Sequence, residues 1–345
     1  MLDPALPIAI FTEATLGTIN AKMAEGILRY GRNPVAAVID STQAGKRLRD
    51  LTGIDRDLPI VATLPEAQAL GAQVLVLGTA PSGGRLPQDW VAVLDQAIEA
   101  GMSLVNGMHD QLQPRYSARL RDGQWVWDLR VPQGDAPPIG MARAAALGNT
   151  RVLMVGTDMA IGKMTAGLEL TRSLQDMGRD AAFLATGQTG IAITGRGIPL
   201  DAIRVDHASG AVERMVLEAA SHDVLVIEGQ GSLLHPGSTA TLPLMRGSCA
   251  THMILCHRAG MQTLDELDRV RIPPLREVIA LNEAVARAAG ALTPARVVAV
   301  ALNTARMTKA EAEAALSAVS DDVGLPAVDP VRQGAGMLAK AVMHA

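Results

Sequence analysis

The feature that most constrains this chain is a buried-strand pattern that leads into a glycine-rich loop and then into a helix. It is the segment VLMVGTDMAIGKMTAGLEL at residues 152–170. Gly156 opens the loop, Gly162 closes it, and Lys163 begins the helix. Glycines let backbone N–H groups approach phosphate oxygens, and a helix N-terminus adds partial positive charge. The segment therefore predicts a phosphate-binding loop between a strand and a helix.

The side chains of this loop have distinct expected roles. Lys163 supplies a full positive charge, and the hydroxyl of Thr165 suits a magnesium ion or a phosphate oxygen. Five residues separate the glycines, and Met164 lies between Lys163 and Thr165, so the spacing differs from GxxxxGK[ST] and argues against the magnesium role. The competing interpretation is a glycine-rich turn with an incidental lysine. We expect the phosphorylated cosubstrate to bind Gly156, Thr157, Gly162, Lys163 and Thr165.

The rest of the chain repeats the order of strand, turn and helix. Apolar runs of four to six residues recur, each followed by a turn signal and a helical pattern, which is typical of a largely parallel α/β sheet. The expected strands span 8–11, 36–39, 60–62, 74–77, 103–105, 152–155, 181–184, 224–227, 253–256 and 297–302. The expected helices span about 19–30, 89–100, 162–177, 211–220, 275–289, 309–319 and 335–343.

A proline-rich segment suggests where the chain divides. A length of 345 residues exceeds what one hydrophobic core usually serves. The segment RVPQGDAPPIG at residues 130–140 holds three prolines and two glycines, which favours a linker. We therefore expect an N-terminal domain at 1–135 and a C-terminal domain at 141–345.

Composition excludes several classes of partner. A formal net charge of −4 and an aromatic content of 2% argue against nucleic acid, which leaves small-molecule substrates. No apolar run is long enough for a membrane span and no leader pattern begins the chain, so we expect a cytoplasmic protein.

Cys249 and Cys256 lack CxxC spacing, so we expect reduced, buried thiols and no metal site. Related P-loop enzymes often form dimers, so a homo-oligomer, dimer or higher, is expected.

A second motif, DVLVIEGQGSLLHP at residues 223–236, places a carboxylate at the end of a buried strand. Ligands of open parallel sheets bind outside the carboxyl ends of the strands, so Glu228 should face the same crevice as Lys163. There a carboxylate can bind metal or accept a proton. The alternative is a glutamate that caps the neighbouring helix. Gln230 and His235, in the same motif, are candidate substrate-binding residues.

A third motif, ATGQTGIAITGRG at residues 185–197, offers neutral hydrogen-bonding groups and a cation. Gln188 and Thr189 are candidate substrate-binding residues, and Arg196 is a candidate clamp for a carboxylate. A glycine-rich surface loop with a solvated arginine explains the same pattern. Asn303, at the end of a later strand, is a candidate contact for a purine base, although a strand-end turn also favours asparagine.

The first half carries weaker signals. Lys22 begins a helix after the first strand, and Asn106, His109 and Asp110 follow a later strand, where they could line a substrate pocket. A structural role for these residues is at least as well supported. Neither loop matches GxGxxG, so no nicotinamide or flavin cofactor is indicated.

These motifs resemble two known families. GTDMAIGK and VIEGQGSLLHP resemble the phosphate loop and acidic strand of dethiobiotin synthetases, over the second domain alone. GTDMAIGKMT, ATGQTGI, GRGI, EGQGSLLHP and NGMHDQL together resemble, over nearly the whole chain, the D-glutamate N-acetyltransferases, long catalogued as a domain of unknown function. The resemblance implies an N-terminal Rossmann-like domain followed by a P-loop NTPase-like parallel-sheet domain.

The resemblance also implies a reaction. In that family acetyl-CoA donates an acetyl group to the amine of D-glutamate, in D-amino acid catabolism. Acetyl transfer needs a base, donors for the oxyanion and a cation for the substrate carboxylates. The candidates are Asp158 or Glu228 as base, Lys163 with the loop N–H groups as donors, and Arg196 as clamp.

Two other functions remain open on the sequence. One is an ATP- and magnesium-dependent ligase like dethiobiotin synthetase, which would use Lys163, Thr165, Asp206 and Glu228 around the metal. The other is a nucleotide-binding regulatory protein that changes conformation without turnover.

Overall fold

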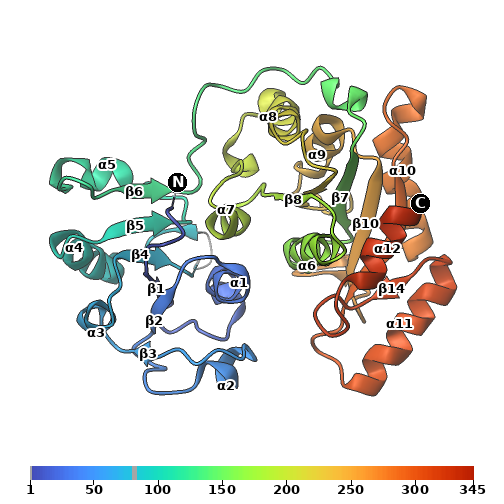
Figure 1. The fold of residues 1–345 in the computed structure, drawn as a ribbon. Helices are drawn as coiled ribbons and strands as arrows, with labels where there is room; N and C mark the ends of the chain where they lie inside the picture. The colour runs from blue at the N-terminus through green and yellow to red at the C-terminus, as the bar shows by residue number, and fades with distance from the viewer. Residues whose placement is uncertain (1, 80–83) are drawn as a thin grey trace. The chain divides into compact units, whose positions relative to one another are not determined.

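The computed structural model describes residues 2–79 and 84–345, which form two compact units (Figure 1). The first unit comprises Met1–Gln133 and Gly187–Ala202, and the second comprises Gly134–Thr186 and Ile203–Ala345. The two units are not two continuous segments of the chain. Residues 187–202 lie with the first unit, because helix α7 (Gln188–Thr194) packs on helix α1 (Lys22–Tyr30).

The first unit is built on a six-stranded parallel sheet. Its strand order, β3-β2-β1-β4-β5-β6, is that of a Rossmann-like fold, with β1 paired to both β2 and β4. All strands are parallel, so their carboxyl ends meet at one edge. They are β1 (Ile8–Phe11), β2 (Val35–Ile39), β3 (Ile60–Val61), β4 (Val74–Leu77), β5 (Ser103–Asn106) and β6 (Val126–Asp128).

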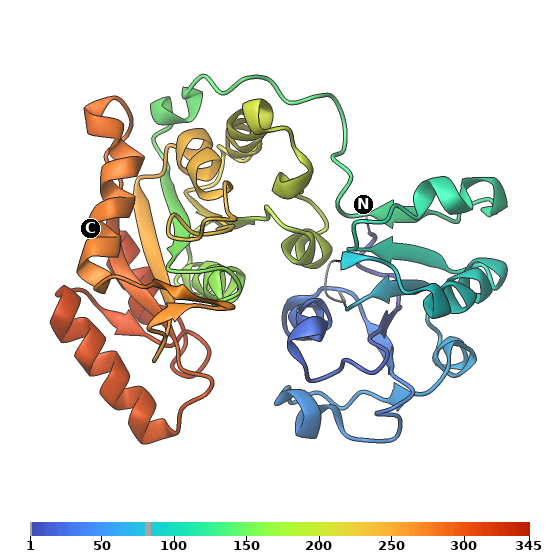
Figure 2. The same ribbon diagram turned by 180° about the vertical axis from the view of Figure 1, so that it is seen from behind.

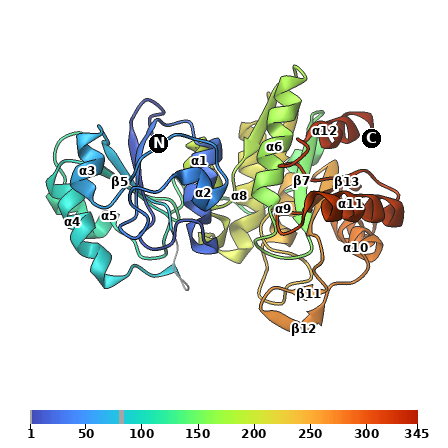
Figure 3. The same ribbon diagram turned by 90° about the horizontal axis from the view of Figure 1, so that it is seen from below.

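The second unit is built on another six-stranded parallel sheet, with the order β14-β13-β10-β7-β9-β8. Strand β7 is central and pairs with β9 and β10. A separate antiparallel hairpin, β11 (Thr263–Leu264) and β12 (Leu267–Arg271), extends from this unit (Figure 3). The six strands are β7 (Thr150–Gly156), β8 (Ala181–Leu184), β9 (Val224–Ile227), β10 (His252–Arg258), β13 (Arg296–Asn303) and β14 (Ala327–Val328).

These sheets confirm the expected α/β fold, and every expected strand is present. The expected helices are also present, although α8 begins at Val205 rather than at residue 211. The sequence did not predict the shortest elements, which carry too few residues for a periodic signal. The remaining helices are α2 (Leu48–Thr52), α3 (Leu64–Ala69), α4 (Val91–Glu99), α5 (Gln113–Tyr116), α6 (Lys163–Asp176), α8 (Val205–Glu218), α9 (Thr241–Ser248), α10 (Leu275–Arg287), α11 (Lys309–Val323) and α12 (Gly336–His344).

Two further expectations concern the whole chain. Cys249 and Cys256 are buried and free, in agreement with the sequence analysis. Within residues 2–79 and 84–345, no helix combines the length and apolar character that crossing a membrane requires.

The segment between the two sheets is irregular, as its prolines predict (Figure 2). In the second unit it is held against α8. The N–H of Met141 donates to Glu213 Oε2 at 2.6 Å, and Arg143 pairs with the same fully buried carboxylate. Gly210 is required at this contact, because a Cβ there would lie 1.8 Å from the carbonyl oxygen of Pro138.

A buried arginine fixes the start of β7. Arg151 is 1% exposed, and its guanidinium donates to backbone carbonyls that precede β7 and to others at the end of α9. Nε and Nη2 reach Cys249 O at 3.1 and 3.0 Å, and Nε also reaches Ser248 O at 3.1 Å. Nη1 donates to Leu147 O at 3.0 Å and to Asn149 O at 2.8 Å. One side chain therefore forms hydrogen bonds with carbonyl oxygens of the segment before β7 and of the end of α9.

We expect Arg151→Met to lower the free energy of unfolding by about 3–5 kcal/mol, because each buried carbonyl left without a donor costs about 1–3 kcal/mol. Chemical denaturation with a circular dichroism readout measures the change. Arg179→Met, at an exposed arginine of the same unit, is the control and should change stability little. Equal midpoints for the two variants would contradict the role of Arg151.

Candidate functional site

The candidate site lies at the carboxyl edge of the second sheet, beyond the ends of the neighbouring strands β7, β9 and β10. The loop at residues 157–162 connects β7 to α6. Gly162 ends this loop with a φ of +111°, a conformation that disfavours other residues. After β9, a Cβ on Gly229 would lie 1.7 Å from Met154 O, so only glycine allows this loop to pass so close to β7.

Lys163 is the central charge of the site. It is 6% exposed, and its Nζ donates to the carbonyl oxygen of Asp158 at 2.5 Å. Its Cδ lies 3.2 Å from where a Cβ on Gly156 would stand and 2.9 Å from that of Gly229, so two glycines make room for it. Burial lowers the pKa of Lys163 to about 8, against the opposing effects of Cys256, Asp158 and Glu228.

Asp158 joins the phosphate loop to the β11–β12 hairpin. Its Oδ1 accepts from the N–H of Met159 at 2.6 Å, and its Oδ2 accepts from the N–H of Asp265 at 2.7 Å. Arg258 completes the junction, since it pairs with Asp265 at 3.1 Å and donates to Ala160 O at 3.1 Å. Both oxygens of this buried carboxylate therefore hold backbone in place.

Thr157, an expected cofactor contact, lies fully buried against β10. Its Oγ1 is 2.9 Å from Nδ1 of His257, and its N–H donates to Cys256 O at 3.1 Å. Burial, aided by the charge of Arg258, lowers the pKa of His257 to about 4, so the imidazole is neutral at pH 7. The sequence analysis did not identify His257, Arg258 or Asp265, although the first two directly follow the predicted strand 253–256.

Glu228 lies at the end of β9, 3% exposed, and connects this strand end to that of β8. Its Oε2 accepts from the N–H of Thr186 at 2.7 Å, and Thr186 Oγ1 donates to its carbonyl oxygen at 2.9 Å. Lys163 Cδ lies 2.9 Å from where a Cβ on the next residue, Gly229, would stand, and the charge of Glu228 raises the pKa of Lys163. This places Glu228 at the edge that the sequence analysis expected.

The loop after Glu228 turns into α9. Gln230 is half-buried, and its carbonyl oxygen accepts from Thr241 Oγ1 at 3.0 Å. His235 is also half-buried, and its Nδ1 accepts from the N–H of Gly237 at 3.1 Å. Both candidate substrate residues thus follow Glu228 at the same sheet edge.

Asn303 and Thr165 are the remaining expected site residues of the second unit. Asn303 Nδ2 donates to Ile161 O at 3.2 Å, and its Oδ1 accepts from the N–H of Ala305 at 3.0 Å. The amide expected to meet a base therefore holds the phosphate loop against the end of β13. Thr165 lies half-buried in the first turn of α6.

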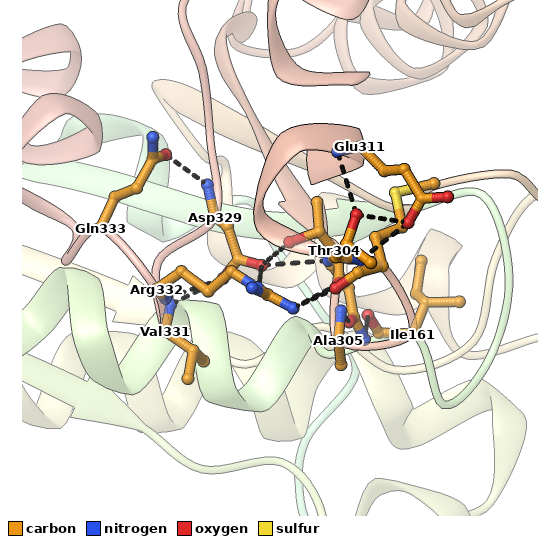
Figure 4. A network of polar contacts seen from close by, with 11 residues as sticks. Ile161, Thr304, Ala305, Glu311, Asp329, Val331, Arg332 and Gln333 are labelled. Atoms are coloured by element: carbon orange, nitrogen blue, oxygen red, sulfur yellow. Dashed lines mark hydrogen bonds and ion pairs between the residues drawn. The ribbon is translucent and has the colours of Figure 1, made fainter. Parts of the chain in front are cut away.

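The turn after Asn303 is fixed by a buried carboxylate (Figure 4). Asp329 Oδ2 accepts from the N–H of Thr304 at 3.0 Å and from its hydroxyl at 2.5 Å. Asp329 Oδ1 accepts from the N–H groups of Val331 and Arg332. Arg332 Nη2 in turn donates to Met307 O at 2.6 Å and to Thr304 O at 3.2 Å. The ends of β13 and β14 are thus connected beside the loop.

The other expected residues lie in the first unit. Gln188 is the first residue of α7, and the next residue, Thr189, is buried. Arg196 follows the end of this helix, and its side chain is exposed. Asn106 has a structural contact, because its Nδ2 donates to Asp128 Oδ1 at 2.7 Å. Asp110 likewise accepts from the N–H of Leu86 at 2.7 Å.

The second unit thus gathers an ammonium, glycines and two carboxylates at one sheet edge, an arrangement suited to binding a phosphorylated ligand beside a base. Residues 138–339 match a family described as a domain of unknown function, DUF1611_C, P-loop domain. Residues 41–132 match its partner, the DUF1611_N Rossmann-like domain.

Two named relatives and a solved structure resemble the chain over most of its length. A D-glutamate N-acetyltransferase from Tritonibacter scottomollicae is 39% identical, over 81% of this chain and 84% of its own. A D-glutamate N-acetyltransferase from a Pseudoalteromonas species is 33% identical, over 78% and 81%. The crystal structure of a DUF1611 family protein from Anabaena variabilis is 47% identical, covers 99% of this chain and 100% of its own, and has a TM-score of 0.95.

The lowered pKa of Lys163 predicts how binding depends on pH. The ammonium is protonated below about pH 8 and loses its proton above it, and an anion binds the protonated form more tightly. The affinity for CoA or ATP should therefore be full below pH 8 and fall above it by up to about tenfold per pH unit. Calorimetric titrations across this range measure the change.

Lys163→Met should bind both ligands weakly at every pH, while keeping the length of the side chain. Lys340→Met, at an exposed lysine of α12, should follow the wild-type profile. Unchanged affinity in the Lys163 variant would show that the loop does not bind phosphate.

Proposed function

The chain belongs to the DUF1611 family, and on that premise we propose that it is an N-acetyltransferase that transfers an acetyl group from acetyl-CoA to the amine of D-glutamate. The observation that carries the proposal is the name of the two relatives, which match this chain across both units. The phosphate loop supports an acyl carrier, because CoA bears an adenosine 3′-phosphate and a pyrophosphate.

In the second unit, the positive charge of Lys163 and the glycines packed around it suit the phosphates of CoA. Gly162, Lys163 and Thr165 would hold the phosphates, with N–H groups of the loop as further donors. The ammonium of Lys163 donates to the carbonyl oxygen of Asp158, and its positive charge would attract the phosphates. When bound, acetyl-CoA supplies the acetyl group as a thioester.

The acceptor amine must lose a proton before its nitrogen attacks the thioester carbonyl carbon. A C–N bond then forms, the C–S bond breaks, and the thiolate of CoA leaves. We assign the base to Glu228. Asp158 suits a structural role better, because its two oxygens already accept from the N–H groups of Met159 and Asp265.

The remaining candidates have roles consistent with this assignment. Gln230 and His235 follow Glu228 at the same strand end and would contact the acceptor. The product would be an N-acetyl amino acid, in keeping with D-amino acid catabolism.

The function is tested by incubating the protein with acetyl-CoA and a panel of D- and L-amino acids while free thiol is measured. We expect thiol release with D-glutamate, little with L-glutamate, and no effect of EDTA, because acyl transfer from a thioester needs no divalent ion. Hydrolysis of ATP that stops in EDTA and resumes with magnesium, without thiol release, would instead identify the ligase.

The base is tested by two matched substitutions. Glu228→Gln should lower kcat by about 10²–10⁴-fold with nearly normal cosubstrate affinity, because it removes basicity and keeps size. Asp158→Asn should mainly lower stability, by about 1–3 kcal/mol, since one backbone N–H loses its acceptor. Rate assays with melting curves separate the two effects. Near-normal kcat in Glu228→Gln would remove Glu228 from the reaction.

A further inference from the structure

Two carbonyl oxygens of the loop at residues 157–162 are held by side chains from neighbouring strands. Arg258 Nη2, at the end of β10, donates to Ala160 O at 3.1 Å. Asn303 Nδ2, at the end of β13, donates to Ile161 O at 3.2 Å. Arg258 and Asn303 are partners in the parallel pairing of β10 with β13, so their side chains project from the same face of the sheet. Both carbonyl groups therefore point to the same side of the loop.

The direction of these carbonyl groups sets the direction of the N–H groups that follow them. The peptide groups of the loop are planar and trans, so the C=O of one residue and the N–H of the next point in opposite directions. Because Ala160 O points to Arg258, the N–H of Ile161 points away from that guanidinium. Because Ile161 O points to Asn303, the N–H of Gly162 points away from that amide.

These two N–H groups are available to a ligand. In the part of the chain that the structure describes, no acceptor receives a hydrogen bond from the N–H of Ile161 or of Gly162. The first turn of α6 follows directly, and its N–H groups have no intrahelical acceptor. A run of successive N–H groups of this kind forms a concave binding site for an anion, to which the helix dipole adds partial positive charge.

The backbone at Ala160 needs support to keep this shape. Its φ of +52° lies in the left-handed region, which disfavours every residue that has a Cβ. Arg258, which holds the carbonyl of Ala160, is 9% exposed and is itself fixed by an ion pair with Asp265 at 3.1 Å. The side chain of Ile161 is 1% exposed and anchors the next residue by packing. The loop is therefore shaped by contacts within the second unit.

We propose that Arg258 and Asn303 are positioning residues that hold the phosphate loop in its anion-binding shape, with the N–H groups of Ile161 and Gly162 directed at a phosphate of the ligand. The inference rests on the phosphate binding of the proposed function. Donors that are already in place bind an anion more tightly, because little conformational freedom remains to be lost on binding. Asn303 then acts through the loop instead of contacting a purine base.

Inorganic pyrophosphate is the probe, because it has the diphosphate that CoA and ATP share and carries no base. Asn303→Leu removes the amide donor at nearly the same size and without a change in charge. Calorimetry should show that it weakens pyrophosphate binding by about 10-fold, as expected when charge-assisted hydrogen bonds to the anion are partly lost. CoA and ATP should be weakened by the same factor.

The matched control for this variant is Asn149→Leu. Asn149 is a half-buried residue of the same unit, before β7, and its amide likewise donates to two carbonyl oxygens, those of Ala220 and His222. It should bind pyrophosphate like the wild type. Melting curves of Asn149→Leu and Asn303→Leu show how much stability each lost amide costs, so a loss of affinity confined to Asn303→Leu is not a general effect on the fold.

Arg258→Lys is the second variant, because it keeps the positive charge and loses the guanidinium that contacts both Ala160 and Asp265. It should also weaken pyrophosphate binding by about 10-fold. Arg276→Lys, at an exposed arginine of α10 that pairs with Asp322, is its control and should bind like the wild type. In rate assays both loop variants should raise KM for acetyl-CoA and leave KM for D-glutamate unchanged.

The outcomes separate the positioning role from the proposed function. If the wild type acetylates D-glutamate but Asn303→Leu and Arg258→Lys bind pyrophosphate normally, the positioning role is wrong and the function stands. If D-glutamate is not acetylated but both variants lose pyrophosphate affinity, the function is wrong and the positioning role stands. Asn303→Leu that binds CoA and ATP weakly and pyrophosphate normally would show a contact with the base and overturn the proposal. A wild type that does not bind pyrophosphate overturns it as well.

Discussion

The site depends on the parallel pairing of β7 along both of its edges. Leu153 pairs with Ile227 of β9, and Gly156 pairs with Cys256 of β10, so the three parallel strands direct their carboxyl ends to one edge of the sheet. That alignment is what brings the phosphate loop, Glu228 and His257 to one edge. Gly229 permits it, because any side chain there would collide with Met154 O. At the opposite end, the guanidinium of Arg151 ties β7 to the end of α9.

Burial and charge are balanced differently at the two sheet edges. In the second unit Lys163 is desolvated, and nearby carboxylates partly offset that cost, so its pKa falls only to about 8. In the first unit the pKa of Lys22 is lowered by desolvation and further by the positive charge of Arg130. Nearby charges therefore act in opposite senses on the two lysines, since carboxylates raise the pKa of Lys163 and an arginine lowers that of Lys22.

The sequence predicted those features that depend on local pattern. Long apolar runs identified the strands, and glycine spacing with Lys163 identified the loop, because both signals lie within one strand–turn–helix unit. It could not show that the oxygens of Asp158 are used by Met159 and Asp265, since the hairpin approaches only in the folded chain. The same limit applies to Asn303, whose amide contacts Ile161 from far along the sequence. The roles of Lys163 and Glu228 in binding and proton transfer stay predictions.

The placement of α7 has a consequence for synthesis of the protein. The first unit includes Gly187–Ala202, which are translated after β7, α6 and β8 of the second unit. Ile27 and Leu28 of α1 and Ile191 of α7 are buried, and the two helices pack together. As the chain leaves the ribosome, α1 therefore emerges well before its partner helix, and β7, α6 and β8 of the second unit emerge between them. Neither unit is encoded by an uninterrupted stretch, so the first unit can be complete only after part of the second has been synthesised.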